Sequence, residues 1–105
     1  MEDITPHELK DMLAQTNAPK VIDVRQDWEY QKCHIDGSHH IPMDQIEDNI
    51  DRLDPDEPIV VVCHHGMRSF QVAQYLVQSG FSNIYNLAGG IDAWAREIDP
   101  AMEQY

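Results

Sequence analysis

The sequence predicts an α/β fold with a mainly parallel sheet, because short strand patterns alternate with helix patterns along the chain. Two of the strand patterns, over residues 21–24 and 59–63, are nearly continuous in apolar character, as in parallel strands buried on both faces. The 105 residues, 42% hydrophobic and 25% charged, suffice for one core and are too few for two. We therefore expect residues 1–105 to form a single domain.

The first half of the chain is predicted to contain a helix, a strand, a short helix and a second strand. The first helix begins at a capping box made by Thr5 and Glu8, with Pro6 in the first helical position. Asp27 is the predicted N-cap of the short helix. The predicted bounds are 6–15 for the first helix, 21–24 for the first strand, 27–30 for the short helix and 40–41 for the second strand.

The second half begins with a polar helical stretch from Asp44 to about Leu53, with Ile46, Ile50 and Leu53 as its buried stripe. The run 59–63 is the most apolar in the chain and too short for a helix, so it predicts a central parallel strand that ends at Cys63. The remaining predicted elements are a helix over 69–79, a strand over 84–87 and a short helix after Gly89-Gly90.

Cys63 lies where chemistry is favoured in such a fold. In open α/β sheets, ligands bind beyond the carboxyl ends of the strands. The segment 63–69 joins the predicted central strand to a helix, and a tight loop there turns backbone N–H groups inward as an anion nest that stabilises a thiolate. Gly66 permits the backbone conformation that such a loop needs. This context favours a reactive thiolate over an inert core cysteine.

Three other side chains of this loop have open roles. His64 and His65 are candidate general acids, anion contacts or polar loop residues. Arg68 is a candidate ligand for an oxyanion substrate, or it pairs with an acid such as Asp23 to brace the loop. We favour substrate binding for Arg68.

Charge and cysteine content exclude several classes of function. The formal net charge of -12 makes nucleic acid and anionic membranes poor partners. Seven acids lie between Asp44 and Glu57, whereas Arg68 is the only formal charge from Pro58 to Ile91. Two cysteines are too few for a disulfide framework, and the sequence shows no membrane span or secretion signal. We expect a cytoplasmic protein without nucleic-acid or membrane partners.

The segment Val62-Cys63-His64-His65-Gly66-Met67-Arg68-Ser69 resembles the active-site loop of rhodanese-domain sulfurtransferases. Further blocks match the family in the right order, at residues 21–25, 34–42 and 87–94. The resemblance implies a small rhodanese fold with a mainly parallel, five-stranded sheet and helices on both faces. It also implies framework roles for Arg25 and His34.

The same resemblance implies that Cys63 attacks the outer sulfur of thiosulfate or a similar donor. Sulfite leaves, and Cys63 holds a persulfide whose terminal sulfur passes to cyanide in vitro or to a thiol in the cell. The implied substrate-binding residues form the loop around the sulfur: His64, His65, Gly66, Met67, Arg68 and Ser69. We expect no cofactor, a thioredoxin-like or other thiol protein as a candidate acceptor, and a monomer or weak dimer.

Cys33 departs from the family pattern, because many members have glycine at this position. It is a candidate resolving thiol, a redox sensor or a neutral replacement, and we favour the neutral replacement.

Three alternatives compete with the sulfurtransferase prediction. A cysteine phosphatase or arsenate reductase also uses a thiolate and an arginine, but its signature spaces them further apart than the four residues between Cys63 and Arg68. A non-catalytic rhodanese-like regulatory module usually lacks the cysteine. We expect no metal site, because adjacent side chains such as His64 and His65 point in opposite directions on an extended segment.

Overall fold

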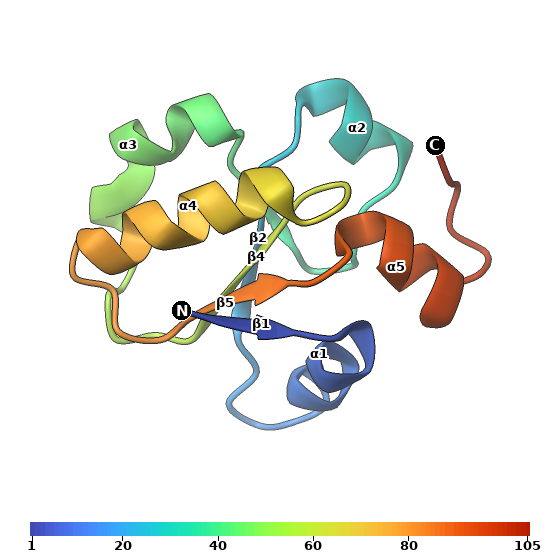
Figure 1. Cartoon of the computed structure of the whole chain (residues 1–105), viewed down its shortest axis with the longest axis horizontal. Helices are drawn as coiled ribbons and strands as arrows, with labels where there is room; N and C mark the ends of the chain where they lie inside the picture. Colours follow the sequence, from blue (N-terminus) through green and yellow to red (C-terminus); the bar gives the residue numbers. More distant parts are fainter.

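The computed structural model describes residues 1–105 and contains a five-stranded sheet in the order β1-β5-β4-β2-β3 (Figure 1). Every pair of neighbouring strands is parallel. The strands are β1 (Glu2–Ile4), β2 (Lys20–Asp23), β3 (His39–His40), β4 (Ile59–Val62) and β5 (Ile84–Leu87). The predicted parallel sheet is confirmed, and β4 is its central strand.

The helices lie close to their predicted positions. They are α1 (Pro6–Leu13), α2 (Asp27–Lys32), α3 (Ile46–Asn49), α4 (Met67–Gln78) and α5 (Gly90–Glu97), with 3-10 turns η1 (Met43–Gln45) and η2 (Ile50–Arg52) on either side of α3. The predicted capping box is present: the Glu8 amide donates to the Thr5 hydroxyl at 3.1 Å, and the Thr5 amide donates to the Glu8 carboxylate at 3.0 Å.

Three local predictions were wrong. The N-cap of α2 is Gln26 rather than Asp27, because the Glu29 carboxylate accepts the Gln26 amide at 3.1 Å. The single helix predicted over 44–53 is split into η1, α3 and η2, in a segment rich in Asp and Asn, which favour helices only weakly. The strand β1 was missed, because only its last residue, Ile4, is buried.

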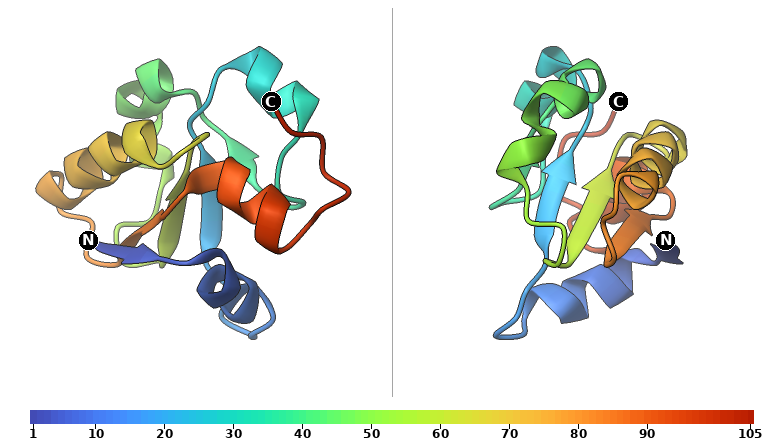
Figure 2. Two further views of the ribbon diagram at one scale, coloured as in Figure 1. Left: turned by 45° about the vertical axis from the view of Figure 1, so that its right-hand side comes forward. Right: turned by 90° about the vertical axis from the view of Figure 1, so that its left-hand side faces the viewer.

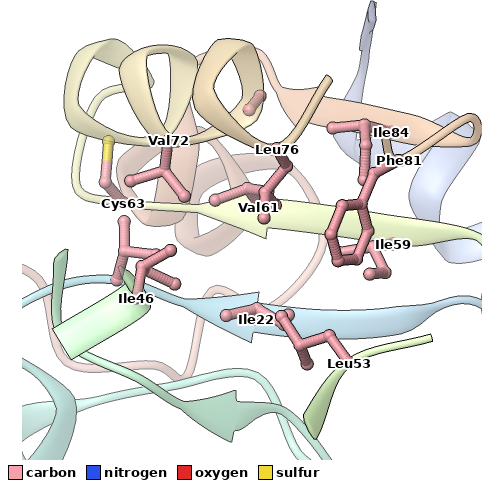
Figure 3. Close-up of a cluster of buried hydrophobic side chains, with 12 residues drawn as sticks. Ile22, Ile46, Leu53, Ile59, Val61, Cys63, Val72, Leu76, Phe81 and Ile84 are labelled. Atoms are coloured by element: carbon pink, nitrogen blue, oxygen red, sulfur yellow. The ribbon is translucent and has the colours of Figure 1, made fainter. Parts of the chain in front are cut away.

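Helices cover both faces of the sheet, which divides the core into two clusters (Figure 2). Alternate residues of β4 face opposite ways: Ile59 and Val61 belong to one cluster, Val60 and Val62 to the other. The first cluster packs against α3 and α4, and the second against α1 and α5. Cys63 continues the alternation, so its side chain lies on the α4 face (Figure 3).

The segment after α5 turns back across the molecule and ends beside α2 (Figures 1 and 2). Its last residue, Tyr105, donates a hydrogen bond to Glu29 of α2 at 2.7 Å. This segment therefore connects α5 to α2, and Glu29 of α2 in turn binds Arg68 at the start of α4. No helix is both long and apolar enough to cross a bilayer.

Candidate active site

The Cys63 sulfur lies at the carboxyl end of the central strand, 1% exposed, under the loop that leads into α4. The Gly66 amide donates a hydrogen bond to Sγ at 3.0 Å, and the Ser69 hydroxyl lies 3.3 Å from it. Among the amides of His64 to Ser69, which we expected to surround the sulfur, Gly66 supplies the one that bonds to it. The sulfur thus has two donors within reach at the N-terminal end of α4.

Gly66 makes this arrangement possible. Its φ of +104° lies in the left-handed region that favours glycine, and it is the N-cap of α4. A Cβ at this position would come within 3.3 Å of the Gly89 amide nitrogen and 3.4 Å of the Leu87 carbonyl oxygen. Any side chain here would therefore push the amide away from the sulfur.

Asn86, on the neighbouring strand β5, orients the second donor. Its Nδ2 donates to the Gly66 carbonyl at 3.2 Å and to the Asp3 carboxylate at 3.0 Å, so its Oδ1 faces the Ser69 hydroxyl, which donates to it. One hydroxyl proton serves one acceptor at a time. Ser69 can therefore turn its proton from Asn86 to the sulfur when the sulfur carries negative charge.

The start of α5 holds the loop from the other side. The Ile91 amide donates to the Cys63 carbonyl at 2.8 Å, and the Asp92 amide donates to the His64 carbonyl at 3.0 Å. These bonds require a close approach at Gly90, whose φ is +59°. A Cβ on Gly90 would overlap the carbonyl oxygens of both Cys63 and His64.

We expect Gly90→Ala to destabilise the fold and to displace the cysteine loop. Gly80→Ala is the matched control, because Gly80 also has a positive φ of +98° but has open space around its missing Cβ. The control should cost roughly 1 kcal/mol of unfolding free energy. Gly90→Ala should cost roughly 1–3 kcal/mol more, from the added overlap. Urea denaturation measures both, and equal losses would contradict this account of Gly90.

Arg68 pairs with an acid, which is the alternative to substrate binding given above, but the partner is Glu29 in place of Asp23. Its Nη1 and Nη2 donate to the two carboxylate oxygens of Glu29 at 2.7 and 2.9 Å. Asp23 is instead bound to Arg25, which is fully buried. Glu29 escaped the sequence analysis because it lies 39 residues from Arg68 and follows no recognisable motif.

Tyr105 connects these two ion pairs. Its hydroxyl accepts a hydrogen bond from Arg25 at 2.8 Å and donates one to Glu29 at 2.7 Å. A continuous chain of polar contacts therefore runs from buried Asp23 to Arg68 in the loop. Burial raises the pKa of Tyr105 to about 12, which keeps the hydroxyl protonated and able to donate to Glu29.

Glu29 makes the stability of this network dependent on acid. Hydrogen bonds from Arg68, Tyr105 and the Gln26 amide outweigh burial and lower the pKa of Glu29 from 4.5 to about 2. A folded-state pKa below the unfolded one means that the stabilisation is complete above about pH 4.5 and is lost as the pH falls toward 2. The shift corresponds to about 2–3 kcal/mol, discounted for the partial exposure of Arg68.

We therefore expect Glu29→Gln to lower the unfolding free energy at pH 7 and to reduce its decline between pH 4.5 and 2. Denaturant unfolding at a series of pH values measures both effects. The same acid dependence in the variant and in the unchanged protein would contradict the assignment to Glu29.

The two loop histidines stack on each other instead of pointing apart, so the geometric reason for excluding a metal was wrong. Their ring centroids are 3.9 Å apart, and the other face of His64 stacks on Tyr105, also at 3.9 Å. Burial and the charge of His65 lower the pKa of His64, against opposing contributions that include the Tyr105 backbone and Asp92. The His64 ring is therefore held between two rings, in surroundings that disfavour its protonated form.

A shallow pocket of about 330 Å³ opens beside the loop. His65, Gly66, Met67, Phe70 and Asn86 are among its lining residues. Met67 is 76% exposed and Phe70 37% exposed, so the rim of the pocket is partly apolar.

Comparison with known proteins shows which family this chain belongs to. Residues 5–97 match the family model described as "Rhodanese-like domain". The chain belongs to the rhodanese-like domain family. A thiosulfate sulfurtransferase GlpE of Pseudomonas paraeruginosa is 40% identical over 98 residues, which are 93% of this chain and 86% of the relative.

Solved structures agree with the fold. A crystal structure from Staphylococcus saprophyticus has a TM-score of 0.85 at 40% identity, covering 93% of this chain and 97% of the other. A rhodanese-like domain protein from Staphylococcus aureus has a TM-score of 0.84 at 37% identity, covering 90% of this chain and 91% of the other. The predicted family and fold are confirmed.

Cys33, the departure from the rhodanese pattern, lies on the other face of the sheet from Cys63. It belongs to the cluster packed against α1 and α5, is 8% exposed, and its sulfur lies 3.9 Å from Nη1 of Arg25. Both cysteines are free thiols. Because Cys33 and Cys63 lie in separate clusters, Cys33 is better explained as a neutral replacement of glycine than as a thiol that resolves the Cys63 persulfide. His34 also has a local structural role, since its ring bonds to the Tyr30 carbonyl at 2.7 Å.

Proposed function

We propose that this protein is a thiosulfate sulfurtransferase that carries sulfur as a persulfide on Cys63. The observation that carries the proposal is the Cys63 sulfur at the end of β4, with the Gly66 amide donating to it at 3.0 Å. Hydrogen bonds to a charged acceptor are stronger than those to a neutral one, so this amide is well placed to bind an anionic sulfur during the reaction. The curated relatives named thiosulfate sulfurtransferase support the choice of substrate.

The reaction takes place in two steps. The Cys63 thiolate attacks the outer sulfur of thiosulfate, the S–S bond of the donor breaks, and sulfite leaves with the electron pair. The new persulfide ends in a terminal sulfur anion about 2 Å beyond Sγ. An acceptor then attacks that terminal sulfur, and Cys63 returns as the thiolate. Cyanide becomes thiocyanate in this second step, and a thiol becomes a persulfide.

The loop offers hydrogen-bond donors and a positive charge to the anionic sulfur of Cys63 and to the anionic sulfur donor. Gly66 and Ser69 offer hydrogen bonds to the sulfur, and Ser69 can redirect its proton from Asn86 as charge builds up. Arg68 is 37% exposed, and its Nε–H makes no hydrogen bond, so contact with an anionic donor remains open to it beside its Glu29 partner. Direct binding of the donor by Arg68, His64, His65 and Met67 is part of the proposal.

The partly apolar rim of Met67 and Phe70 suits approach of a protein thiol, and we include a thioredoxin-like or other thiol protein among the acceptors. A thiol acceptor requires reducing surroundings, which fits the two free cysteines and supports a cytoplasmic site of action. The protein acts as a monomer or weak dimer in this proposal.

Intact-mass spectrometry tests the proposal. Purified protein treated with thiosulfate should gain one sulfur, about 32 Da, and cyanide should remove it. Cys33→Ser should still gain the sulfur, and Cys63→Ser should not. If neither thiosulfate nor another sulfane donor adds sulfur to Cys63, the proposal fails and the non-catalytic module becomes the better interpretation.

A further inference from the structure

Two histidines of the cysteine loop and one carboxylate of α5 converge next to, but not on, the sulfur. One ligand atom from each of His64, His65 and Asp92 lies within 4.8 Å of the other two. The two histidines come from the segment before α4, and Asp92 lies in the first turn of α5. The Cys63 sulfur does not belong to this group.

Two side chains of this cluster, His64 and Asp92, have neighbours that keep them near the site before any ligand binds. The His64 ring is held between His65 and Tyr105, with both centroid distances at 3.9 Å. Arg96 donates two hydrogen bonds to Asp92, at 3.2 and 3.1 Å, and both go to Oδ2. Oδ1 of Asp92 makes no hydrogen bond, so this oxygen is available to a ligand. Such support of a ligand by a second residue is typical of metal sites.

The backbone keeps the three ligands together. The Asp92 amide donates to the His64 carbonyl at 3.0 Å, so the helix residue is tied directly to the loop residue. Zn²⁺ at about 2.0–2.1 Å from each ligand needs the ligand atoms roughly 3.3 Å apart. His65 is exposed and Asp92 half-buried, so both side chains have room to rotate toward this spacing, with the His65 ring turning out of its stack on His64.

Two imidazole nitrogens and one carboxylate oxygen form a donor set that suits Zn²⁺ and similar borderline divalent cations. Mg²⁺ and Ca²⁺ prefer all-oxygen ligands. The net charge of -12 attracts cations in general, but it does not select nitrogen-preferring ones. Selectivity for Zn²⁺ therefore has to come from the two histidines.

We propose that His64, His65 and Asp92 form a binding site for Zn²⁺ or a similar divalent transition-metal ion, bridging the cysteine loop and α5. The three protein ligands leave the fourth position to water or to a small anion. The Cys63 sulfur is not among its ligands, and the site does not depend on sulfur transfer, although it shares His64 and His65 with the loop proposed to bind the donor.

Zn²⁺ titration against a chromophoric chelator, with excess Mg²⁺ to occupy weak acidic sites, tests the proposal. One ion should bind per chain. Asp92→Asn and His65→Gln should each weaken binding at least about 10-fold. The control His39→Gln removes an exposed histidine of β3 and should bind as the unchanged protein does. Circular dichroism verifies that each variant is folded.

Cys63→Ser separates this site from coordination by the thiolate. The variant should keep the affinity for Zn²⁺, and Co²⁺ bound to the unchanged protein should show ligand-field absorption without a thiolate-to-metal charge-transfer band. Loss of binding in Cys63→Ser would overturn the proposal in favour of a thiolate site. Unchanged binding in Asp92→Asn, or no stoichiometric binding at all, would also overturn it. None of these readouts requires sulfurtransferase activity.

Discussion

Cys63→Ser is expected to lose at least about 10³-fold in the rate of thiocyanate formation from thiosulfate and cyanide. The reaction proposed here passes through a persulfide on this residue, and a serine hydroxyl cannot form one. Removal of a covalent nucleophile typically costs several orders of magnitude in turnover. The fold should be retained, since the serine oxygen can still accept the Gly66 amide. Initial rates at saturating thiosulfate measure the loss.

Cys33→Ser is the matched control for that measurement. Cys33 is also a buried free thiol, but it lies in the cluster on the opposite face of the sheet. Its turnover should stay within about threefold of the unchanged protein, because a buried cysteine acts mainly as a small apolar side chain. Equal losses in both variants would mean that thiol removal acts through folding, and retained turnover in Cys63→Ser would refute the mechanism.

Asp23→Asn is expected to lower the unfolding free energy by about 3–5 kcal/mol, the cost of leaving a buried charge without its partner. Asp23 accepts hydrogen bonds from Nε and Nη2 of Arg25, at 2.9 and 2.8 Å, and both side chains are essentially inaccessible to solvent. Asparagine keeps the size of the side chain but removes the negative charge and presents an amide donor to the guanidinium. Arg25 cannot move into solvent without disturbing Tyr105 and Cys33.

Lys32→Gln provides the comparison for Asp23→Asn. Lys32 pairs with Glu103 at 3.3 Å, but the two side chains are 34% and 61% exposed. An exposed pair contributes up to about 1 kcal/mol, so this variant should unfold nearly as the unchanged protein does. Urea denaturation of both variants measures the contrast. If Asp23→Asn lowers the unfolding free energy by less than about 1 kcal/mol, the buried charge of Arg25 does not depend on Asp23 for its stabilisation.

Most of the sheet and the position of Cys63 could be predicted because their signals are local. The run Ile59–Cys63 carries its own hydrophobic pattern, and the following loop carries the family resemblance. The strand β1 lacked such a signal, since Glu2 and Asp3 are exposed and its pairing with β5 spans most of the chain. Its existence depends on tertiary structure.

The network around the loop could not be predicted for the same reason. Glu29 contacts Arg68 across 39 residues and Tyr105 across 76, and Asn86 reaches Asp3 across 83. Each is a single polar residue without a motif, and only the fold brings the partners together. Arg68 could be identified from the sequence as the charged residue of the loop, but the acid that pairs with it could be identified only from the structure.

The separation of the two thiols by the sheet determines how the protein withstands oxidants. A peroxide that converts Cys63 to a sulfenic acid leaves it with no thiol in the same core, since Cys33 lies behind the central strands. No internal disulfide can then protect the sulfur from irreversible sulfinic and sulfonic acids. A protecting disulfide has to form with a second molecule, so this route of protection depends on the concentration of small thiols around the protein.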